Sequence, residues 1–243
     1  YRHRLRHEIK TICDRNFAKY FLMVQETVNW ATSQGIMTGP GRGSAAGSLV
    51  SYLLGITKLD PIEHKLSFER FLSPARVNQL PDIDLDFEAI RREEVIEHLR
   101  EKYGGDCVSK ISTSNTLAGR RALRDVAKVF SVSDAEVSPV AGLIVEAIEE
   151  EEQQEGSLRE TLVATEVGKA FQERHPKTCR VALRLEGQIR DVGQHAAGVV
   201  VSSRPLAEIV PLESRGQGKT RVPVVAFDWH ASEAMGLVKL DVL

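Results

Sequence analysis

Residues 81–87 read PDIDLDF, and in this stretch aspartate alternates with apolar residues. Successive side chains of a β-strand point to opposite faces, so Asp82, Asp84 and Asp86 would share one face and the apolar side chains the other. Carboxylates about 7 Å apart on a partly buried face repel one another, and each must take up a proton or meet a cation. The stretch therefore predicts a strand whose acidic face binds a hard divalent cation such as Mg²⁺.

The composition of the chain is that of a soluble globular protein. Of its 243 residues, 42% are hydrophobic and 27% are charged, which is enough apolar material for one large or two smaller domains. No stretch approaches the ~20 apolar residues of a membrane span, and the basic N-terminal segment lacks the apolar core of a signal peptide. Three widely spaced cysteines without a CxxC pair argue against a disulfide framework or a structural zinc site. We therefore expect a cytoplasmic protein.

The charge is unevenly distributed along the chain. A net charge of −2 does not by itself indicate a nucleic-acid-binding protein. The segment EAIEEEEQQE at residues 146–155 holds six glutamates, however, so the remainder of the chain is net positive. The run of acidic residues at 149–155 has no function that the sequence explains, and its negative charge would repel DNA.

The hydrophobic pattern predicts an α/β (α+β) protein with a mixed sheet that is interrupted by a helical insertion. Two helices are expected in the first 35 residues and one in RREEVIEHLREKYG, with a short strand in CVSKIST. Residues 116–186 have a helical pattern throughout, whereas AAGVVVSS, VPVVAFDW and GLVKLDVL are β-rich. These changes divide the chain into residues 1–113, 114–192 and 193–243.

The segment GPGRGSAAGS, residues 39–48, predicts a phosphate-binding loop. Glycine lets the backbone approach a phosphate closely, and the segment offers consecutive N–H groups and two serine hydroxyls. If SLVSYLLGI continues as a helix, the positive end of its dipole would face the same place. The segment matches neither a Walker A loop nor a dinucleotide-binding fingerprint, so a tight packing turn is the alternative interpretation.

A third acidic residue, Asp241, lies in the strand-like segment GLVKLDVL. Lys239 precedes it by two positions and therefore faces the same side of that strand. Two or three carboxylates suffice to hold a pair of Mg²⁺ ions roughly 3.5–4 Å apart for phosphoryl transfer. A lysine beside them could neutralise a triphosphate, although a simple salt pair between Lys239 and Asp241 is the structural alternative.

Five segments in order, GPGRGSAAGSLVSYLLGIT, FERFLSPARV, LPDIDLDF, GQHAAGVVV and GLVKLDVL, resemble the palm region of the bacterial C-family DNA polymerases. The resemblance extends over nearly the whole chain. It implies a nucleotidyltransferase-type (polymerase beta-like) palm formed by residues 1–113 and 193–243. It also implies that residues 114–192 are a helical thumb, which grips the primer–template duplex.

The resemblance assigns roles to individual residues. It implies that Asp82, Asp84 and Asp241 are catalytic and bind two Mg²⁺ ions, while Asp86 is left out of the catalytic set. The nucleotide-binding set that it implies contains five residues: Gly43, Ser44, Gly47, Ser48 and Lys239. On the thumb, Arg120, Arg124 and Lys128 would follow one helical face and contact DNA phosphates, with a solvated basic face as the alternative.

Three further residues are weaker candidates for contacts with nucleotide or DNA. Arg42 lies in the glycine-rich segment, and Arg70 lies in FERFL, where it would orient an acid or a phosphate or simply be a surface charge. His195, in the expected loop GQHAAG, is more often a structural hydrogen-bonding residue than a catalyst.

The resemblance implies template-directed addition of dNMP to a primer 3′-hydroxyl, with primer–template DNA and dNTP as partners. It also implies that a full-length parent contacts the sliding clamp and other replisome subunits, and that this fragment alone polymerises little or not at all. Two alternatives stay open: a small-substrate nucleotidyltransferase, and a catalytically inactive nucleic-acid-binding module.

Overall fold

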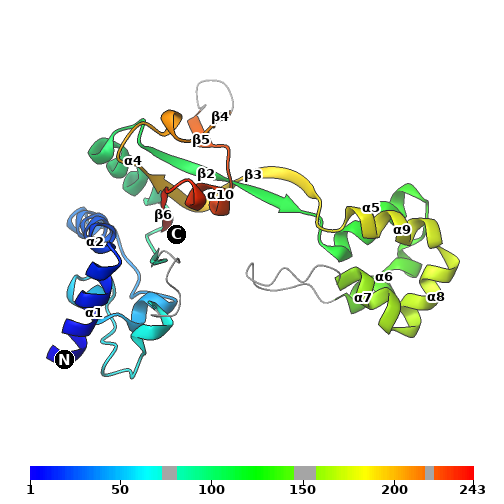
Figure 1. Ribbon diagram of the computed structural model, residues 1–243. Coiled ribbons are helices and arrows are strands. Elements are labelled where there is room, and N and C mark those ends of the chain that lie inside the picture. The colour runs from blue at the N-terminus through cyan, green and yellow to red at the C-terminus, as the bar shows by residue number, and fades with distance from the viewer. Residues whose placement is uncertain (73–80, 145–156, 217–221) are drawn as a thin grey trace. The chain divides into compact units, whose positions relative to one another are not determined.

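The structure is a computed structural model that describes residues 1–72, 81–144, 157–216 and 222–243. The chain forms two compact units: residues 1–113 with 194–243, and residues 114–193 (Figure 1). Among the described helices, none has both the length and the apolar character that crossing a membrane requires.

The first unit begins with the two expected helices, α1 (Arg2–Asp14) and α2 (Ala18–Ser33). The glycine-rich segment that follows is only partly a loop, since its second half forms a 3-10 helix, Ser44–Gly47. It leads into the short helix α3 (Leu49–Leu53). The expected helix at the start of SLVSYLLGI is therefore present, although it spans little more than one turn.

The acidic stretch enters a six-stranded mixed sheet with the order β1-β6-β3-β2-β5-β4. Regular strand geometry in this stretch is limited to β1 (Asp84–Leu85), which is shorter than the sequence suggested. The alternation itself is confirmed, because Ile83, Leu85 and Phe87 are all buried. The other strands are β2 (Val108–Thr116), β3 (Ile189–Val201), β4 (Leu212–Arg215), β5 (Val222–Val225) and β6 (Val238–Val242).

The sheet pairing brings together segments that are far apart in the sequence. Strand β1 runs parallel to β6, and β6 runs antiparallel to β3. At the other side of the sheet, β2 runs parallel to β5 and β5 runs antiparallel to β4. Short 3-10 helices at Phe68–Arg70 and Leu206–Glu208 complete the connections of this unit.

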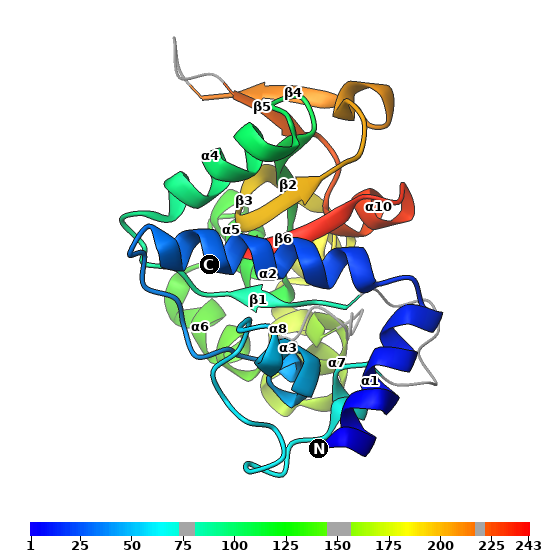
Figure 2. The same ribbon diagram turned by 90° about the vertical axis from the view of Figure 1, so that its left-hand side faces the viewer.

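Helices pack against the sheet of the first unit and share a buried core with its strands. Helix α2 passes in front of β6 in Figure 2, with β1 beside it, and its Phe21 and Val24 belong to the same buried cluster as Leu85 and Leu240. Helix α4 (Arg92–Tyr103) adds apolar residues to this cluster and ends at Gly104, whose φ of +101° favours glycine. Helix α10 (Trp229–Ala234) precedes β6.

Between the end of β2 and the start of β3, the described part of the second unit is mainly helical, as the hydrophobic pattern predicted. Its helices are α5 (Gly119–Val129), α6 (Asp134–Leu143), α7 (Ser157–Ala164), α8 (Glu166–Arg174) and α9 (Pro176–Leu185). They enclose their own core, in which Leu123, Val140 and Phe171 are fully buried. The run of acidic residues at 149–155 lies outside the described residues.

Strand β3 starts earlier than the sequence indicated. It begins at Ile189 and includes His195, so the expectation that His195 lies in a loop is wrong. The first residues of β3 are mostly exposed and lack a buried apolar face, which is why their pattern did not indicate a strand. Leu117 and Gly187, at the base of this segment, are joined by a backbone hydrogen bond of 2.8 Å.

Candidate metal centre and nucleotide site

Three carboxylates converge where β1 and β6 lie side by side. Asp84 on β1 is directly opposite Asp241 on β6 in the parallel register, and Asp82 lies two residues before Asp84. Each of the three offers an oxygen, and these oxygens lie within 4.8 Å of one another. The structure therefore brings together the three predicted aspartates, which are 159 residues apart at their widest separation along the sequence (Asp82 to Asp241).

The position of the acidic stretch is fixed from the opposite side by the core. Because Ile83 and Leu85 point into the apolar cluster, the aspartates between and beside them must point away from it. The backbone N–H of Ile83 also donates to the hydroxyl of Tyr20, at 3.1 Å. Tyr20 is buried on α2, and burial raises the pKa of its hydroxyl, so this group stays neutral and anchors the backbone between Asp82 and Asp84.

The electrostatics of the three carboxylates favour a bound cation. Asp82 keeps contact with solvent at the rim of the site, but withdrawal of its carboxylate from water raises its pKa to about 6. The charge of Lys239 opposes this rise, while Asp241 and Asp84 add to it. The pKa of Asp84 is also raised, first by burial and then by the negative charge of Asp241. Negative charge is thus concentrated beyond what the nearby cations neutralise.

Lys239 is the one cation held inside this acidic group among the described residues. Its Nζ lies 2.7 Å from Oδ2 of Asp241 and 4.9 Å from the centre of the Trp229 ring. Burial lowers the pKa of Lys239, but its hydrogen bond to Asp241 and the surrounding carboxylates outweigh this effect, so the pKa is raised overall. Lys239 is therefore a permanently charged group whose direction is fixed by an acid and an aromatic ring.

The second oxygen of Asp241 is the strongest indication that the site accepts a metal ion. Asp241 is 6% exposed, and its Oδ1 is buried without a hydrogen-bond partner in the described part of the chain. A buried carboxylate oxygen without a donor is costly, and a divalent cation would satisfy it. Three carboxylates with one such oxygen are a donor set of the kind that Mg²⁺ prefers, so the residues present fit the ion.

Asp86 is engaged differently from the other aspartates. Arg42 of the glycine-rich segment contacts both of its carboxylate oxygens, at 2.8 Å and 3.1 Å. This two-point contact neutralises Asp86 and joins the glycine-rich segment to the acidic stretch. The backbone N–H of Gly39 donates to the Asp86 carbonyl at 2.9 Å, which adds to this connection. The predicted metal ligands do not include Asp86, and its carboxylate is engaged by Arg42.

The first half of the glycine-rich segment lies against the carboxylates. Gly43 has a φ of +60°, and a Cβ added to it would lie 3.5 Å from Oδ2 of Asp84. Both Gly43 and Ser44 are exposed. Their exposed backbone and hydroxyl groups next to Asp84 are placed where a phosphate that shares the metal could be bound.

The second half of the segment is used for packing. Gly47 is buried against the backbone of residue 67, where a Cβ would come within 2.4 Å of the Ser67 carbonyl oxygen. Ser48 is fully buried, and its Oγ donates to Glu8 and accepts from the N–H of Ser51. The predicted nucleotide-binding set therefore separates into an exposed pair, Gly43 and Ser44, and a buried pair, Gly47 and Ser48.

The N-terminus of α3 does not offer the free anion site that the sequence suggested. Oε2 of Glu8 accepts hydrogen bonds from the N–H of Val50 and from the Ser48 hydroxyl, each at 3.0 Å. The carboxylate of Glu8 thus takes the place at this helix end that a phosphate would otherwise take. The expectation that the helix dipole of this segment binds the nucleotide is corrected accordingly.

The two weaker candidates outside the loop differ in their surroundings. Arg70 ends a 3-10 helix and is exposed. Nδ1 of His195 accepts from the N–H of Gly198 at 2.5 Å and of Ala197 at 3.3 Å. A side chain at position 198 would collide with this ring, since a Cβ there would lie 2.7 Å from Nδ1. The local contacts of His195 are those of a residue that shapes strand β3.

In the second unit, the predicted basic face of α5 is only partly available. Arg120 donates to the carbonyl of Ile144 at 2.8 Å, and Arg124 pairs with Asp134 at 2.9 Å. Lys128 is exposed. Two of the three predicted DNA-binding side chains thus make contacts that join α5 to the end of α6 and to its first turn.

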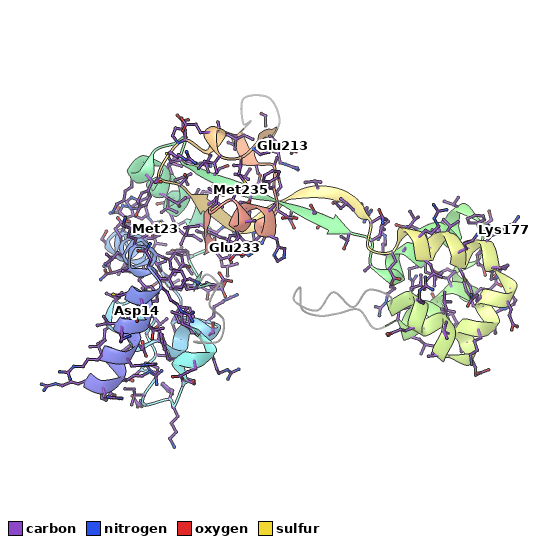
Figure 3. The ribbon with its side chains drawn as sticks, viewed as in Figure 1. Asp14, Met23, Lys177, Glu213, Glu233 and Met235 are labelled. Atoms are coloured by element: carbon purple, nitrogen blue, oxygen red, sulfur yellow. The ribbon has the colours of Figure 1, made fainter. Side chains whose placement is uncertain are left out.

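A second basic face, on α9, was not recognised in the sequence. Lys177, Arg180 and Arg184 are all exposed and are spaced so that they follow one side of the helix. Figure 3 shows Lys177 on the outer side of the second unit. Within the described residues, none of the three forms an ion pair. The signal that could have revealed this face is the i, i+3, i+7 spacing of basic residues in PKTCRVALRL.

Comparison with known proteins identifies the family to which the chain belongs. A family model described as "Bacterial DNA polymerase III alpha NTPase domain" matches residues 1–243. The chain is similar to DNA polymerase III subunit alpha of Thermus aquaticus, with 44% identity over 99% of this chain and 19% of the relative. The corresponding proteins of Yersinia pestis and Bacillus subtilis are each 42% identical, over 99% and 100% of this chain and 20% and 21% of their own lengths.

The chain spans about a fifth of the length of the curated relatives it matches. Within that fifth the match runs from the first residue of the chain to the last. It therefore includes the acidic stretch, the glycine-rich segment and strand β6 together. The chain belongs to the bacterial DNA polymerase III alpha NTPase domain family.

Proposed function

We propose that this chain is the palm and thumb region of a template-directed DNA polymerase, which adds dNMP to a primer 3′-hydroxyl by two-metal-ion nucleotidyl transfer. The observation that carries the proposal is the convergence of Asp82, Asp84 and Asp241, with their ligand oxygens within 4.8 Å of one another. The buried and unpaired Oδ1 of Asp241 supports it further. Membership of the DNA polymerase III alpha family supplies the class of reaction.

In this proposal the three carboxylates hold two Mg²⁺ ions. Such ions supply Lewis-acid activation of the attacking hydroxyl and stabilise the charge of the leaving pyrophosphate. Asp84 and Asp241 face each other across the parallel pair and Asp82 lies at the rim, so these three residues would hold the ions. The contribution of the chain itself is to position charge, because the core fixes the backbone on which the three carboxylates stand.

The nucleotide triphosphate would lie between the carboxylates and the glycine-rich segment. Gly43 and Ser44 are exposed beside Asp84, so their N–H and hydroxyl groups are available to phosphate oxygens. Lys239, oriented by Asp241 and Trp229, would counter the charge that develops on the phosphates. We leave Gly47 and Ser48 out of direct nucleotide contact, because both are buried and engaged elsewhere.

The two units then have distinct roles. The unit of residues 1–113 and 194–243 would be the palm, and the unit of residues 114–193 the thumb. We assign the main DNA phosphate contacts of the thumb to the basic face of α9, together with Lys128 of α5. This revises the expected α5 face, in which Arg120 and Arg124 have partners within the second unit.

Activity of the whole protein needs more than this chain. In the proposal, the full-length protein also contacts the sliding clamp and other replisome subunits through regions outside residues 1–243. The isolated chain is expected to give little or no primer extension. Robust synthesis by the isolated chain would contradict the proposal that polymerisation requires regions outside residues 1–243.

The direct test of the metal site is an anomalous-difference map. Crystals of the full-length protein that carries this chain are soaked in Mn²⁺ together with a nucleoside triphosphate. Density bridged by Asp82, Asp84 and Asp241, with phosphates beside Ser44, is the expected result. Manganese bound elsewhere, with none at these carboxylates, would exclude the two-metal proposal.

A further inference from the structure

A buried ion pair on α1 supports the glycine-rich segment from behind. Nε of Arg4 lies 2.6 Å from Oε1 of Glu8, and the two residues are one helical turn apart. The Glu8 side chain is completely buried, whereas that of Arg4 is 24% exposed. A fully buried carboxylate is costly unless every oxygen is satisfied, so its partners indicate what it is for.

Both oxygens of Glu8 are indeed satisfied, and by different parts of the chain. Oε1 accepts from Arg4, while Oε2 accepts from the Ser48 hydroxyl and the Val50 N–H, each at 3.0 Å. The Ser48 oxygen in turn accepts from the N–H of Ser51 at 3.1 Å. Glu8 therefore fixes the point at which the glycine-rich segment turns into α3.

Arg4 fixes the same segment at a second point. Its Nη2 donates to the carbonyl of Gly47 at 2.8 Å and to the carbonyl of Leu66 at 3.2 Å. The guanidinium also lies 5.9 Å from the centre of the Phe68 ring, which is fully buried. Arg4 thereby joins residues 47 and 66, at the place where Gly47 packs closely on the backbone of Ser67.

These contacts lie one 3-10 turn away from the residues that approach the carboxylates. The turn Ser44–Gly47 connects the fixed end at Gly47 and Ser48 to Gly43, which lies beside Asp84. A short 3-10 turn transmits position with little freedom, because its hydrogen bonds close over three residues. Displacement at Ser48 would therefore displace Gly43 and Ser44 relative to Asp84.

We propose that Glu8 and Arg4 are positioning residues for nucleotide binding, which act through Ser48 and Gly47 on the exposed Gly43–Ser44 pair. The inference rests on the proposed function, since it assumes that this pair contacts the triphosphate. Neither residue touches substrate or metal. Their role is to hold the loop in the position where the phosphates of the nucleotide and the carboxylates can bind the same metal ion.

The first test is Glu8→Gln in the full-length protein that carries this chain. The substitution keeps the size of the side chain, but its NH₂ group must face one of the donors that Glu8 now accepts from. We expect KM for dNTP to rise about tenfold, comparable to the loss of one hydrogen bond to a charged group, with kcat changed less than about threefold. The matched control is Lys10→Met, which breaks the exposed i, i+4 pair of Lys10 and Asp14 on the same helix.

A second variant separates positioning from folding. Arg4→Met combined with Glu8→Leu removes the buried charge of Glu8 together with its partly buried partner and replaces both with apolar groups, a change that often preserves stability. Ser48 and Val50 nevertheless lose their acceptor. We expect the melting temperature of this double variant to lie closer to that of the unmodified protein than the melting temperature of Glu8→Gln does. KM for dNTP should stay raised. Recovery of KM along with stability would show that the pair serves folding alone and would overturn the inference.

Ser48→Ala distinguishes the inference from direct phosphate binding by Ser48. If Ser48 acts through Glu8, then Ser48→Ala and Glu8→Gln together raise KM by clearly less than the product of the single effects. If Ser48 binds phosphate itself, Ser48→Ala raises KM and Glu8→Gln leaves it unchanged, which overturns the inference.

A measurement that does not depend on catalysis tests the Glu8 network independently of the proposed polymerase function. Amide hydrogen exchange at Val50 and Ser51 should accelerate in Glu8→Gln and not in Lys10→Met. If Asp241→Asn leaves polymerisation intact, the proposed function fails whatever Glu8 does. If exchange at Val50 and Ser51 accelerates but KM is unchanged, the network exists and the positioning role is overturned.

Discussion

The two units of the molecule use charged side chains in opposite ways. In the first unit, Asp82, Asp84 and Asp241 gather around one lysine, so that negative charge exceeds the charge available to neutralise it. In the second unit, the basic side chains of α5 are largely paired, and those of α9 stand free of ion pairs among the described residues. Charge left uncompensated by the fold therefore indicates a ligand, whereas charge in pairs indicates structure.

The same distinction holds within single elements. On α1, the pair of Arg4 and Glu8 contacts the glycine-rich segment, whereas the exposed Lys10 and Asp14 pair with each other and form no further ion pair among the described residues. In the acidic stretch, Asp86 is neutralised by Arg42, whereas burial and Asp241 raise the pKa of Asp84 despite the opposing charges of Arg42 and Lys239. Ion pairs with the same spacing, and aspartates of the same stretch, thus differ in role because their partners differ.

The largest expected effect is at Asp241. Asp241→Asn in the full-length protein should lower kcat for primer extension at least ~1,000-fold, because it removes a charge that both metal positions would share. The control is Asp14→Asn, the same substitution at an exposed acid on α1. Extension assays under single-turnover conditions measure the effect. Retention of more than a tenth of the activity would contradict the interpretation that the uncompensated carboxylates of the first unit bind metal ions.

Lys239 should follow with a smaller effect. Lys239→Met removes the charge next to Asp241 but keeps a side chain of similar length against Trp229. We expect kcat/KM for dNTP to fall about 100-fold. Loss of the lysine also removes a charge that lowers the pKa of Asp82 and, together with Arg42, that of Asp84, so the acidic limb of the pH–rate profile should move to higher pH. An unchanged profile would mean that Lys239 is only a partner of Asp241.

The second unit is tested by comparing its two basic helices. Replacing Lys177, Arg180 and Arg184 of α9 by Gln should weaken primer–template binding roughly 30-fold and lower the slope of log K against log salt by about 3. Replacing Arg120 and Arg124 of α5 by Gln should weaken binding less. Fluorescence anisotropy at several salt concentrations measures both. A larger effect from α5 would restore the sequence-based assignment.

The smallest effect concerns pH and the metal ion. The folded-state pKa of Asp82, about 6 without metal, lies above its unfolded value, so its contribution to stability is present below pH ~4 and is lost as the pH rises through 6. A divalent ion must displace that proton. Affinity for Mn²⁺, followed by electron paramagnetic resonance of the free ion, should fall about tenfold per pH unit below 6 and level off above ~7. A flat dependence from pH 5 to 7.5 would remove Asp82 from the site.

The acidic stretch and the last strand were the parts of the site that could be predicted best. In PDIDLDF and GLVKLDVL, carboxylates lie within apolar, strand-like stretches, where burying their charge is unfavourable unless a ligand compensates it. This can be recognised from the residues of each stretch alone. The parallel pairing that sets Asp84 opposite Asp241 could not be predicted, because register depends on contacts between strands far apart in the chain.

The glycine-rich segment shows where sequence patterns mislead. Glycine and serine at positions 43–44 and 47–48 look alike in the sequence, yet one pair is exposed and the other buried. The difference comes from Glu8, 40 residues away from Ser48, and from the close approach of the Ser67 backbone to Gly47. Such partners are set by tertiary packing, which local spacing does not encode.

The register between β1 and β6 also constrains how the protein folds. All of the second unit lies between Asp84 and Asp241 in the chain, so their pairing closes a very long loop and is a contact of high sequence separation. During synthesis, Asp82 and Asp84 leave the ribosome before β6 exists. Their carboxylates then repel each other without the partner strand until β6 has been synthesised. The three carboxylates therefore come together only after β6 has been synthesised, and a divalent ion that bound all three would act on a folded chain and stabilise the pairing of β1 with β6.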